Sequence, residues 1–463
     1  MASSPAPASH QGSERRRWSD TWIFVLALAG ASMGFKTIWQ FPFLVSQNGG
    51  AAFVLVYLLL AFLIGVPLLI AQVMLGRHVH ASPITTFAEL GAREPGGRAW
   101  AVVGGVAVLG GFIVFSYLSV IAGWVIAYWV RALAGTFSGL TADGIGNVFA
   151  GFVKDPEKQV FWYTLFISAV AIVAGAGLRR GLDATVRWLA PALYGTMIVL
   201  AVYAAYAGSL EDALIYFLAP DFTKLSASAW LNAGAQVFFS FGLGTGVALM
   251  YGAYLRADVS IPRAAVMVAG IDVISGIVAG MVVFAVLFGG GVGPASGPSL
   301  VFQALPLAFD HLPYGRWFAW VFFALLVAVA MLMGIALFEP LIAWLCERFK
   351  WRRQRAALVT GIAAWLLGLV TVFSFNYGAF SFKLLGVEKH LGMFDILQTA
   401  SAEFMLPLAA CGMAIFAGWM MPTERARAEL RFRSPYYFDM WLWLLRWVSP
   451  LLLAILLFTL YRL

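Results

Sequence analysis

Three ionisable side chains lie inside long apolar stretches of this sequence. Lys36 is near the centre of ALAGASMGFKTIWQFPF, Glu339 lies in a second apolar run, and Glu403 lies in a third. A lysine at membrane depth costs roughly 3 kcal/mol on insertion scales, so an intramembrane charge indicates a functional site. Proton relay is one role open to the two glutamates, but for both we favour a structural role in a helix contact.

No catalytic or metal-binding pattern accompanies these charges. The sequence has no Cys/His ligand spacing, no phosphate-binding loop and no nucleophile–base arrangement. Its two cysteines, Cys346 and Cys411, are too few for a disulfide framework. We therefore expect neither an enzyme nor a cofactor. The histidines all lie in tails or loops, namely His10, His78, His80, His311 and His390.

The composition is that of a polytopic membrane protein. Of the 463 residues, 62% are hydrophobic and 11% are charged, which is more apolar surface than a soluble domain can bury. We expect a disordered tail at 1–19, a core of ten helices at 20–421, and a loop with one further helix at 422–463. Windows of about 20 apolar residues predict about eleven spans, near 21–45, 51–76, 100–133, 160–177, 185–208, 228–254, 264–290, 315–346, 356–376, 393–420 and 437–460.

The basic residues are concentrated on one side of this arrangement. Most Lys and Arg residues fall in the N-terminal tail and in the even-numbered connections, which places the N-terminus in the cytoplasm. The net charge of +8 therefore reports topology and does not indicate a nucleic-acid partner. We expect a multi-pass protein of the cell inner membrane, surrounded by lipid, as a monomer or weak homodimer.

Two predicted spans carry glycines in their middle. The first contains Gly30 and Gly34, and the sixth contains Gly242, Gly244 and Gly246 at alternate positions. A glycine destabilises a helix interior by about 1 kcal/mol relative to alanine. Interrupted spans at corresponding places in two five-helix halves indicate the solute site of an inverted-repeat transporter. The alternative is that these glycines only allow helices to pack closely.

A series of motifs runs in order along most of the chain: WQFP at 39–42, QNGG at 47–50, GVP at 65–67, MLGR at 74–77, SVIAGW at 119–124, QVFFS at 236–240, IALFEP at 335–340, FD at 394–395 and LP at 406–407. In these motifs the sequence resembles the neurotransmitter:sodium symporter family, which has the leucine-transporter fold. The resemblance implies an all-α membrane protein with a 5+5 inverted repeat, broken helices 1 and 6, and one extra helix.

The resemblance also implies a solute site at the two helix breaks. The backbone amides of Phe35 and Lys36 would bind a carboxylate. Gly34, which stands where monoamine carriers have an aspartate, suits a solute with its own carboxylate. Phe239 would cover the pocket, and Leu118 stands where the family usually has a carboxylate-binding tyrosine. The other lining residues implied are Ala31, Ser32, Val114, Ser240, Gly242, Thr245 and Leu337.

At the family's first sodium site, the sequence carries altered charges. The matching side chains are Thr37, Ser240 and Asp272, and Lys36 stands beside them where the family has glycine. Our hypothesis is that the Lys36 ammonium replaces the sodium charge, with Asp272 and the solute anion as counter-ions. Alternatively, Lys36 extends into an aqueous vestibule, or a Lys36–Asp272 pair is purely structural.

Two further ion sites of the family are also changed. Leu332 and Met333 replace the two hydroxyl ligands of the second sodium site, and neither side chain offers an oxygen, so we expect that site to be lost. At the chloride site Gly276 stands where the family has Ser or Glu, while Tyr57 and Gln236 remain. We therefore expect no chloride requirement and leave sodium open.

The two gates of the family differ in this sequence. Gln40 and Gln398 replace the Arg–Asp pair of the outer gate, which leaves an uncharged pair that can still hydrogen-bond. At the inner gate, the resemblance implies a latch of Arg15, Glu347 and Tyr254. A protein with both helix breaks and an inner latch is expected to alternate access.

The predicted function is therefore secondary transport of a small amino acid or amino-acid-like solute. With Lys36 in place of sodium, transport would be proton-coupled or an uncoupled exchange. A first alternative is a sodium symporter that uses the altered site of Thr37, Ser240 and Asp272. A second alternative is a non-transporting sensor built on the same fold.

Overall fold

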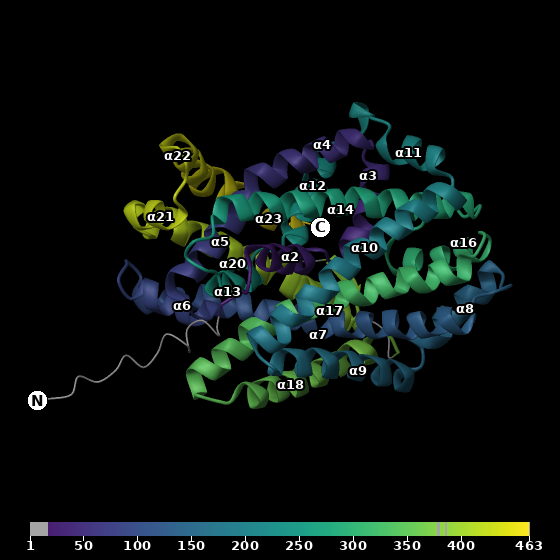
Figure 1. Ribbon diagram of the computed structural model, residues 1–463, viewed down its shortest axis with the longest axis horizontal. Coiled ribbons are helices and arrows are strands. Elements are labelled where there is room, and N and C mark those ends of the chain that lie inside the picture. The colour runs from purple at the N-terminus through teal and green to yellow at the C-terminus, as the bar shows by residue number, and fades with distance from the viewer. Residues whose placement is uncertain (1–16, 377–379, 385–386, 463) are drawn as a thin grey trace, which may run out of the picture.

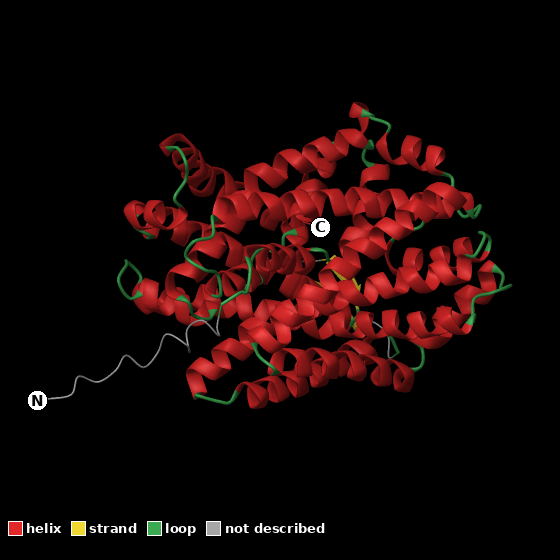
Figure 2. Ribbon diagram, in the orientation of Figure 1, coloured by secondary structure: helices red, strands yellow, loops and turns green. Residues whose placement is uncertain are grey.

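The computed structural model describes residues 17–376, 380–384 and 387–462. Most of its long helices run along the long axis of the molecule (Figure 1). The described chain is helical apart from one small antiparallel hairpin, in which β1 (Phe380–Leu384) pairs with β2 (Val387–Leu391) (Figure 2). The predicted all-α fold is thus confirmed, with this hairpin as an addition.

In the described part of the chain, nine helices are long and apolar enough to cross a membrane. A tenth span is the pair α2 (Thr21–Ser32) and α3 (Phe35–Gln47), whose axes bend by 62° at the break. The sixth predicted span is two short helices, α12 (Ala227–Ser240) and α13 (Val247–Ala253). The nine continuous spans are α4–η1–α5 (Ala51–Leu60, Ala61–Gly65 and Val66–Val79), η2–α7 (Gly97–Trp100 and Ala101–Ala134), α9 (Pro156–Gly175), η3–α10 (Leu178–Asp183 and Ala184–Ala207), α14 (Ile261–Gly289), α17 (Gly315–Phe349), α18 (Arg353–Ser374), α19–η6–α20–η7 (Met393–Gln398, Thr399–Met405, Leu406–Ile415 and Phe416–Met420) and α22–η8–α23 (Pro435–Trp443, Leu444–Val448 and Ser449–Arg462).

Glycine produces the break between α12 and α13. Gly242, Gly244 and Gly246 all have positive φ angles, which L side chains rarely adopt. A Cβ atom at Gly244 would lie 2.1 Å from the carbonyl oxygen of Leu406, so this position also needs glycine for close approach. The sequence prediction of an interrupted sixth span is confirmed.

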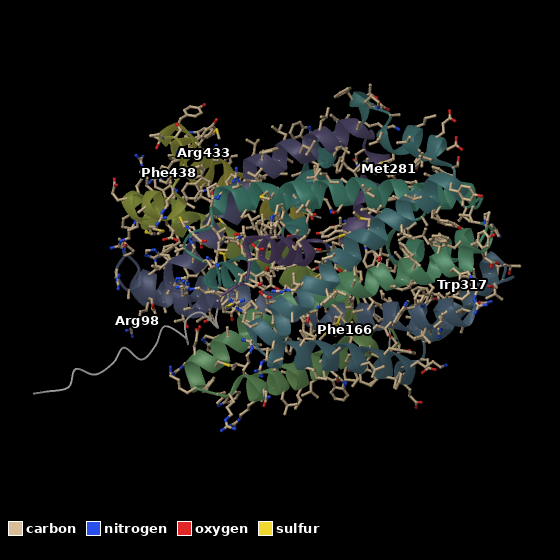
Figure 3. The ribbon with its side chains drawn as sticks, viewed as in Figure 1. Arg98, Phe166, Met281, Trp317, Arg433 and Phe438 are labelled. Atoms are coloured by element: carbon tan, nitrogen blue, oxygen red, sulfur yellow. The ribbon has the colours of Figure 1, made fainter. Side chains whose placement is uncertain are left out.

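The two ends of the molecule differ in their residues. Arg98 and Arg433 lie at one end and Trp317 lies at the other (Figure 3), in agreement with the uneven distribution of basic residues along the sequence.

Shorter helices connect the spans. The connecting helices are α6 (Pro83–Gly91), α8 (Ala142–Val153), α11 (Leu210–Leu218), η4 (Phe222–Lys224), α15 (Gly297–Ser299), η5 (Leu300–Ala304), α16 (Leu305–Asp310) and α21 (Thr423–Leu430).

A packed scaffold supports the two broken spans. The helices α7 and α17 lie against each other over much of their length, and α9 and α18 cover them. The rings of Phe115 and Phe338 meet at 4.9 Å between centroids in the contact of α7 with α17. A Cβ atom at Gly334 would lie only 2.8 Å from the ring of Phe166, which holds α9 close to α17. Such close packing fixes the wall against which the broken spans are placed.

Candidate functional site

A cavity of about 440 Å³ lies between the two helix breaks. It is bounded by both halves of the first and sixth spans and by α7, α17 and the η6 region. Every residue expected in the solute site lines it, namely Ala31, Ser32, Gly34, Phe35, Lys36, Val114, Leu118, Phe239, Ser240, Gly242, Thr245 and Leu337. The structure therefore brings together residues that are separated by as much as 300 positions in the sequence.

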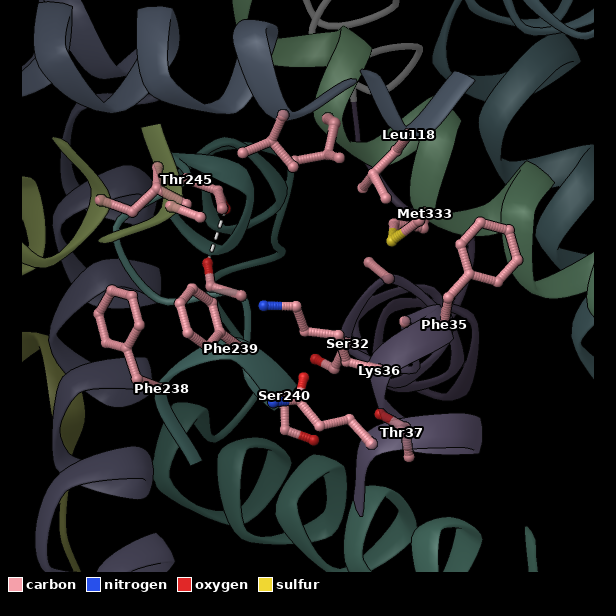
Figure 4. Close-up of a pocket in the computed structure, with 18 of the residues that line it drawn as sticks. Ser32, Phe35, Lys36, Thr37, Leu118, Phe238, Phe239, Ser240, Thr245 and Met333 are labelled. Atoms are coloured by element: carbon pink, nitrogen blue, oxygen red, sulfur yellow. Dashed lines mark hydrogen bonds between the residues drawn. The ribbon is translucent and has the colours of Figure 1, made fainter. Parts of the chain in front are cut away.

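Lys36 extends into this cavity. Its Nζ atom lies 4.1 Å from the centroid of the Phe239 ring, and Figure 4 shows the side chain reaching across the space toward that ring. Among the described residues no ion pair reaches Lys36. The charge of Glu403 acts on it through space, but Glu403 does not line the cavity. The ammonium is therefore open to an anion inside the cavity.

The expected Lys36–Asp272 pair is absent from the described structure. The buried Asp272 carboxylate accepts hydrogen bonds from the Tyr57 hydroxyl at 3.0 Å and the Ser240 hydroxyl at 2.7 Å, both through Oδ2. Its other oxygen, Oδ1, is buried without a hydrogen-bond partner in the described residues. Two hydroxyl donors hold the short Asp272 side chain, while the longer Lys36 chain reaches the aromatic face. Asp272 therefore does not serve as the direct counter-ion of Lys36.

An apolar side chain fills the region of the expected second sodium site. Leu332 is buried, and its Cδ1 atom lies 2.7 Å from the place where a Cβ atom at Gly30 would be. Met333 lines the cavity beside Gly34. Sodium requires oxygen ligands to offset its lost hydration, and these two side chains supply none.

The N-terminus of α3 faces the cavity. Gly34 is the N-cap residue of α3, and no side chain caps the helix, which also has no acidic residue in its first turn. The first amides of a helix and its dipole favour an anion. Phe35 and Lys36 of this first turn both line the cavity. A carboxylate placed here would meet both the helix terminus and the Lys36 ammonium.

The two glutamines of the expected outer gate lie on the same cavity. Gln40 comes from α3 and Gln398 from the end of α19, and both belong to the cavity wall. Ser296, Gly297 and Pro298, from the connection after α14, line it as well. No hydrogen bond joins the two amides in the part of the chain that the structure describes.

The expected inner latch of Arg15, Glu347 and Tyr254 stays a prediction, and no hydrogen bond joins Glu347 to Tyr254 among the described residues. Glu347 accepts hydrogen bonds from the Ser82 amide at 2.8 Å and the Thr85 hydroxyl at 2.6 Å, at the start of α6. The reason is that the uncapped N–H groups at a helix start attract a carboxylate. Arg15, the third member of the expected latch, lies outside the described residues.

A different network joins Tyr254 to the scaffold. The Tyr254 hydroxyl donates to Glu339 at 2.6 Å, and Arg353 forms an ion pair with the other oxygen of this fully buried carboxylate. The indole of Trp18 donates to the carbonyl of Tyr251 at 3.1 Å, which holds the chain before α2 against α13. These contacts agree with the structural role that we favoured for Glu339 from the sequence.

Several cavity residues were missed by sequence reasoning. Tyr117 precedes Leu118 on α7, and both line the cavity, as do Ile121 one turn later and Phe238 and Leu406. The spacing of Tyr117, Leu118 and Ile121 on one helix face was the only available signal, since apolar residues of a membrane helix look alike whether they face lipid or a cavity.

Comparisons with known proteins support this architecture. The sequence profile described as the Sodium:neurotransmitter symporter family matches residues 15–141 and 157–462. An uncharacterised sodium-dependent transporter of Haemophilus influenzae is 28% identical over 96% of this chain and 97% of its own, and one of Bacillus subtilis is 28% identical over 95% and 96%.

One solved structure matches over nearly the same length. The crystal structure of MhsT in complex with L-phenylalanine has a TM-score of 0.85 and 32% identity, and the match covers 96% of this chain and 99% of that one. With the family profile covering almost the whole sequence and both helix breaks in place, this chain belongs to the sodium:neurotransmitter symporter family and is a multi-pass membrane transporter.

Proposed function

We propose that this transporter carries a small amino acid or amino-acid-like solute with a carboxylate by alternating access, and that Lys36 supplies the positive charge of a bound sodium ion. The observation that carries this proposal is the Lys36 ammonium inside the cavity, 4.1 Å from Phe239 and without an ion-pair partner in the described residues. The solute carboxylate would be its counter-ion, beside the start of α3.

The names of similar proteins support the solute class. A relative in Drosophila pseudoobscura, 26% identical over 79% of this chain and 64% of its own, is named a sodium-dependent nutrient amino acid transporter. The matched MhsT structure contains L-phenylalanine. An amino acid or a related acid is therefore the first group of solutes to test.

Leu332 supports the replacement of sodium. Its side chain packs against Gly30 and offers no oxygen where the family's second sodium site has a hydroxyl ligand. Transport would then be proton-coupled or an uncoupled exchange. Asp272, buried with one unpartnered oxygen, is the acidic group through which a proton would be carried.

The unpartnered Oδ1 oxygen of Asp272 also favours the alternative of a sodium symporter. Oδ1 of Asp272, with Ser240 and Thr37 nearby in the wall between α14, α12 and α3, would suit a sodium ion at the altered first site. The relatives named sodium-dependent transporters agree with this second candidate. Chloride would not be needed in either case, because the Asp272 carboxylate reaches Tyr57 and supplies the negative charge there.

Uptake into proteoliposomes tests these candidates. The purified protein would be assayed with labelled amino acids and their keto-acid analogues under an inward sodium gradient, an inward pH gradient, and neither gradient. Accumulation driven by pH, or exchange without any gradient, supports the proposal. Sodium-driven accumulation refutes it in favour of the sodium symporter. No uptake in any condition would instead favour the sensor.

We also propose the orientation of the protein. The end that carries Arg98 and Arg433 would face the cytoplasm, with the N-terminus, by the positive-inside rule (Figure 3). Cysteine labelling from outside intact cells at Trp317, on the opposite end, would be expected to succeed, and labelling at Arg433 would fail. The opposite pattern would reverse the orientation.

A further inference from the structure

Building on the proposed carrier function, we infer that the solute is an apolar monocarboxylate without an α-ammonium group. A branched-chain 2-oxo acid is the simplest solute of this class. The inference follows from the charge of the cavity, from the uncapped donors at the start of α3, and from the apolar character of the remaining wall.

The cavity carries a positive charge, and no acidic side chain is among the described residues that line it. Lys36 is the only charged side chain among the described residues that line it. Asp272 and Glu403 both lie outside the lining, and Asp272 is held by Tyr57 and Ser240. An anion would neutralise this cavity. A zwitterion would bring a second ammonium close to Lys36, where low dielectric strengthens the repulsion between like charges.

Some backbone acceptors at the two breaks are already partly in use. An ammonium group needs hydrogen-bond acceptors around it, since it offers three donors. Four carbonyls near the breaks each accept a hydrogen bond from a nearby amide, which occupies one of their two lone pairs, namely those of Ser32 at 2.8 Å, Gly34 at 3.0 Å, Phe239 at 3.1 Å and Gly242 at 3.4 Å. The start of α3, which has no side-chain cap, offers donors that suit a carboxylate.

The wall away from Lys36 is apolar. Val114, Leu118 and Ile121 from α7 line the cavity together with Leu337 from the adjoining α17. Leu118 and Met333 lie on the same side of the space, opposite the Phe238 and Phe239 rings (Figure 4). Such a wall stabilises a branched or aromatic tail by burial and offers nothing to a polar one. The cavity thus recognises a carboxylate at the α3 end and a hydrocarbon at the other.

Matched solutes separate this inference from the parent proposal. Binding of L-leucine, 4-methyl-2-oxopentanoate and 3-methylbutylamine would be measured by calorimetry on the protein in nanodiscs. The three share a branched tail but carry both charges, only the carboxylate, and only the ammonium, respectively. We expect the oxo acid to bind at least tenfold more tightly than leucine, and the amine not to bind measurably.

Variants identify the group responsible. Lys36→Gln should lose the preference for the oxo acid, and Lys36→Arg should retain it, which shows that the site still folds. The exposed Lys158, which pairs with Asp155 on the surface of α9, gives a matched control, and Lys158→Gln should bind as the wild type does. Equal binding of the oxo acid by Lys36→Gln and the wild type would overturn the inference.

The uptake assay distinguishes failure of this inference from failure of the carrier proposal. Leucine that binds as tightly as the oxo acid and enters proteoliposomes would overturn this inference and leave the carrier proposal standing. Absence of both binding and uptake for all three solutes would overturn the carrier proposal, and the inference with it. Uptake of the oxo acid in preference to leucine, lost in Lys36→Gln, supports both.

Discussion

The Nζ atom of Lys36 lies 4.1 Å from the centroid of the Phe239 ring, so the two broken spans meet through a cation and an aromatic face. A cation–π contact contributes about 0.5–2 kcal/mol, and it leaves the remaining sides of the ammonium open. The same ring borders the cavity opposite the start of α3. This contact would hold the charge in place without neutralising it, as a binding site for an anion requires.

Substitution of Gly30 should destabilise the fold through Leu332. In Gly30→Ala the new Cβ atom would lie 2.7 Å from Leu332 Cδ1, and overpacking of this kind costs about 1–3 kcal/mol. Thermal unfolding in detergent should show a lower midpoint, partly recovered in Gly30→Ala with Leu332→Ala. Gly270→Ala, in a helix position with no atom within 4 Å, is the control and should not lose stability. An unchanged midpoint for Gly30→Ala would mean that this packing is wrong.

Removal of Arg353 should leave a buried charge without its partner. Glu339 is fully buried, and loss of one member of a buried pair costs about 3–5 kcal/mol. Arg353→Met should therefore lower the unfolding midpoint strongly, and the added change Glu339→Gln should recover part of the loss. Lys158→Met breaks an exposed pair with Asp155, worth about 0–1 kcal/mol, and serves as the control. Equal midpoints for Arg353→Met and Lys158→Met would contradict the predicted role of the pair.

Acid should weaken the attachment of α21. The His78 ring and the Arg77 guanidinium hold the pKa of Glu429 at about 2, below its ordinary value of 4.5. Because the folded-state pKa is the lower one, this stabilisation is complete above pH 4.5 and is lost as the pH falls from 4.5 toward 2. The loss amounts to at most about 1.4 kcal/mol per pH unit.

A comparison of two variants checks this pH dependence. Glu429→Gln should flatten the stability profile between pH 4.5 and 2, whereas Glu424→Gln, exposed on the same helix, should follow the wild type. Thermal midpoints measured through that range provide the test. If the thermal midpoint of Glu429→Gln falls between pH 4.5 and 2 as steeply as that of the wild type, another group causes the loss of stability in acid.

Loss of the Asp272 charge should uncouple transport from protons. Asp272→Asn keeps the hydrogen bond from either Tyr57 or Ser240 but cannot take up a proton. We expect accumulation driven by a pH gradient to disappear while solute exchange persists. Ser275→Ala, which removes a hydroxyl bonded within α14, is a control on the same helix and should keep both activities. Full pH-driven accumulation in Asp272→Asn would exclude Asp272 as the carrier.

The break between α12 and α13 was predictable because its cause is local. Gly242, Gly244 and Gly246 have positive φ angles that only glycine adopts readily, so their sequence pattern carries the geometry. The lining of the cavity was also predictable, since the resemblance places residues in register and both breaks fall at the cavity. At this cavity, the sequence therefore predicted which backbone segments come together.

Side-chain pairing was not predictable in the same way. The sequence predicted that Lys36 and Asp272 would pair at the altered first sodium site. In the structure the Lys36 side chain instead contacts the Phe239 ring, and Asp272 accepts hydrogen bonds from Ser240 and Tyr57. Glu347 accepts hydrogen bonds from the Ser82 amide and the Thr85 hydroxyl at the start of α6, and Arg353 pairs with Glu339 from the next helix. No sequence pattern names a partner of this kind, because it depends on which neighbours the packed helices bring within reach.

The central claim is that Lys36 stands in for bound sodium, and solute binding by Lys36→Gly tests it most directly. The wild type and the variant would be titrated with the preferred solute in buffers of equal ionic strength that contain either sodium or N-methylglucamine. The account predicts equal wild-type affinity in both buffers, and in the variant either no binding or binding only with sodium. Wild-type binding that requires sodium, or sodium-independent binding that survives in Lys36→Gly, would contradict it.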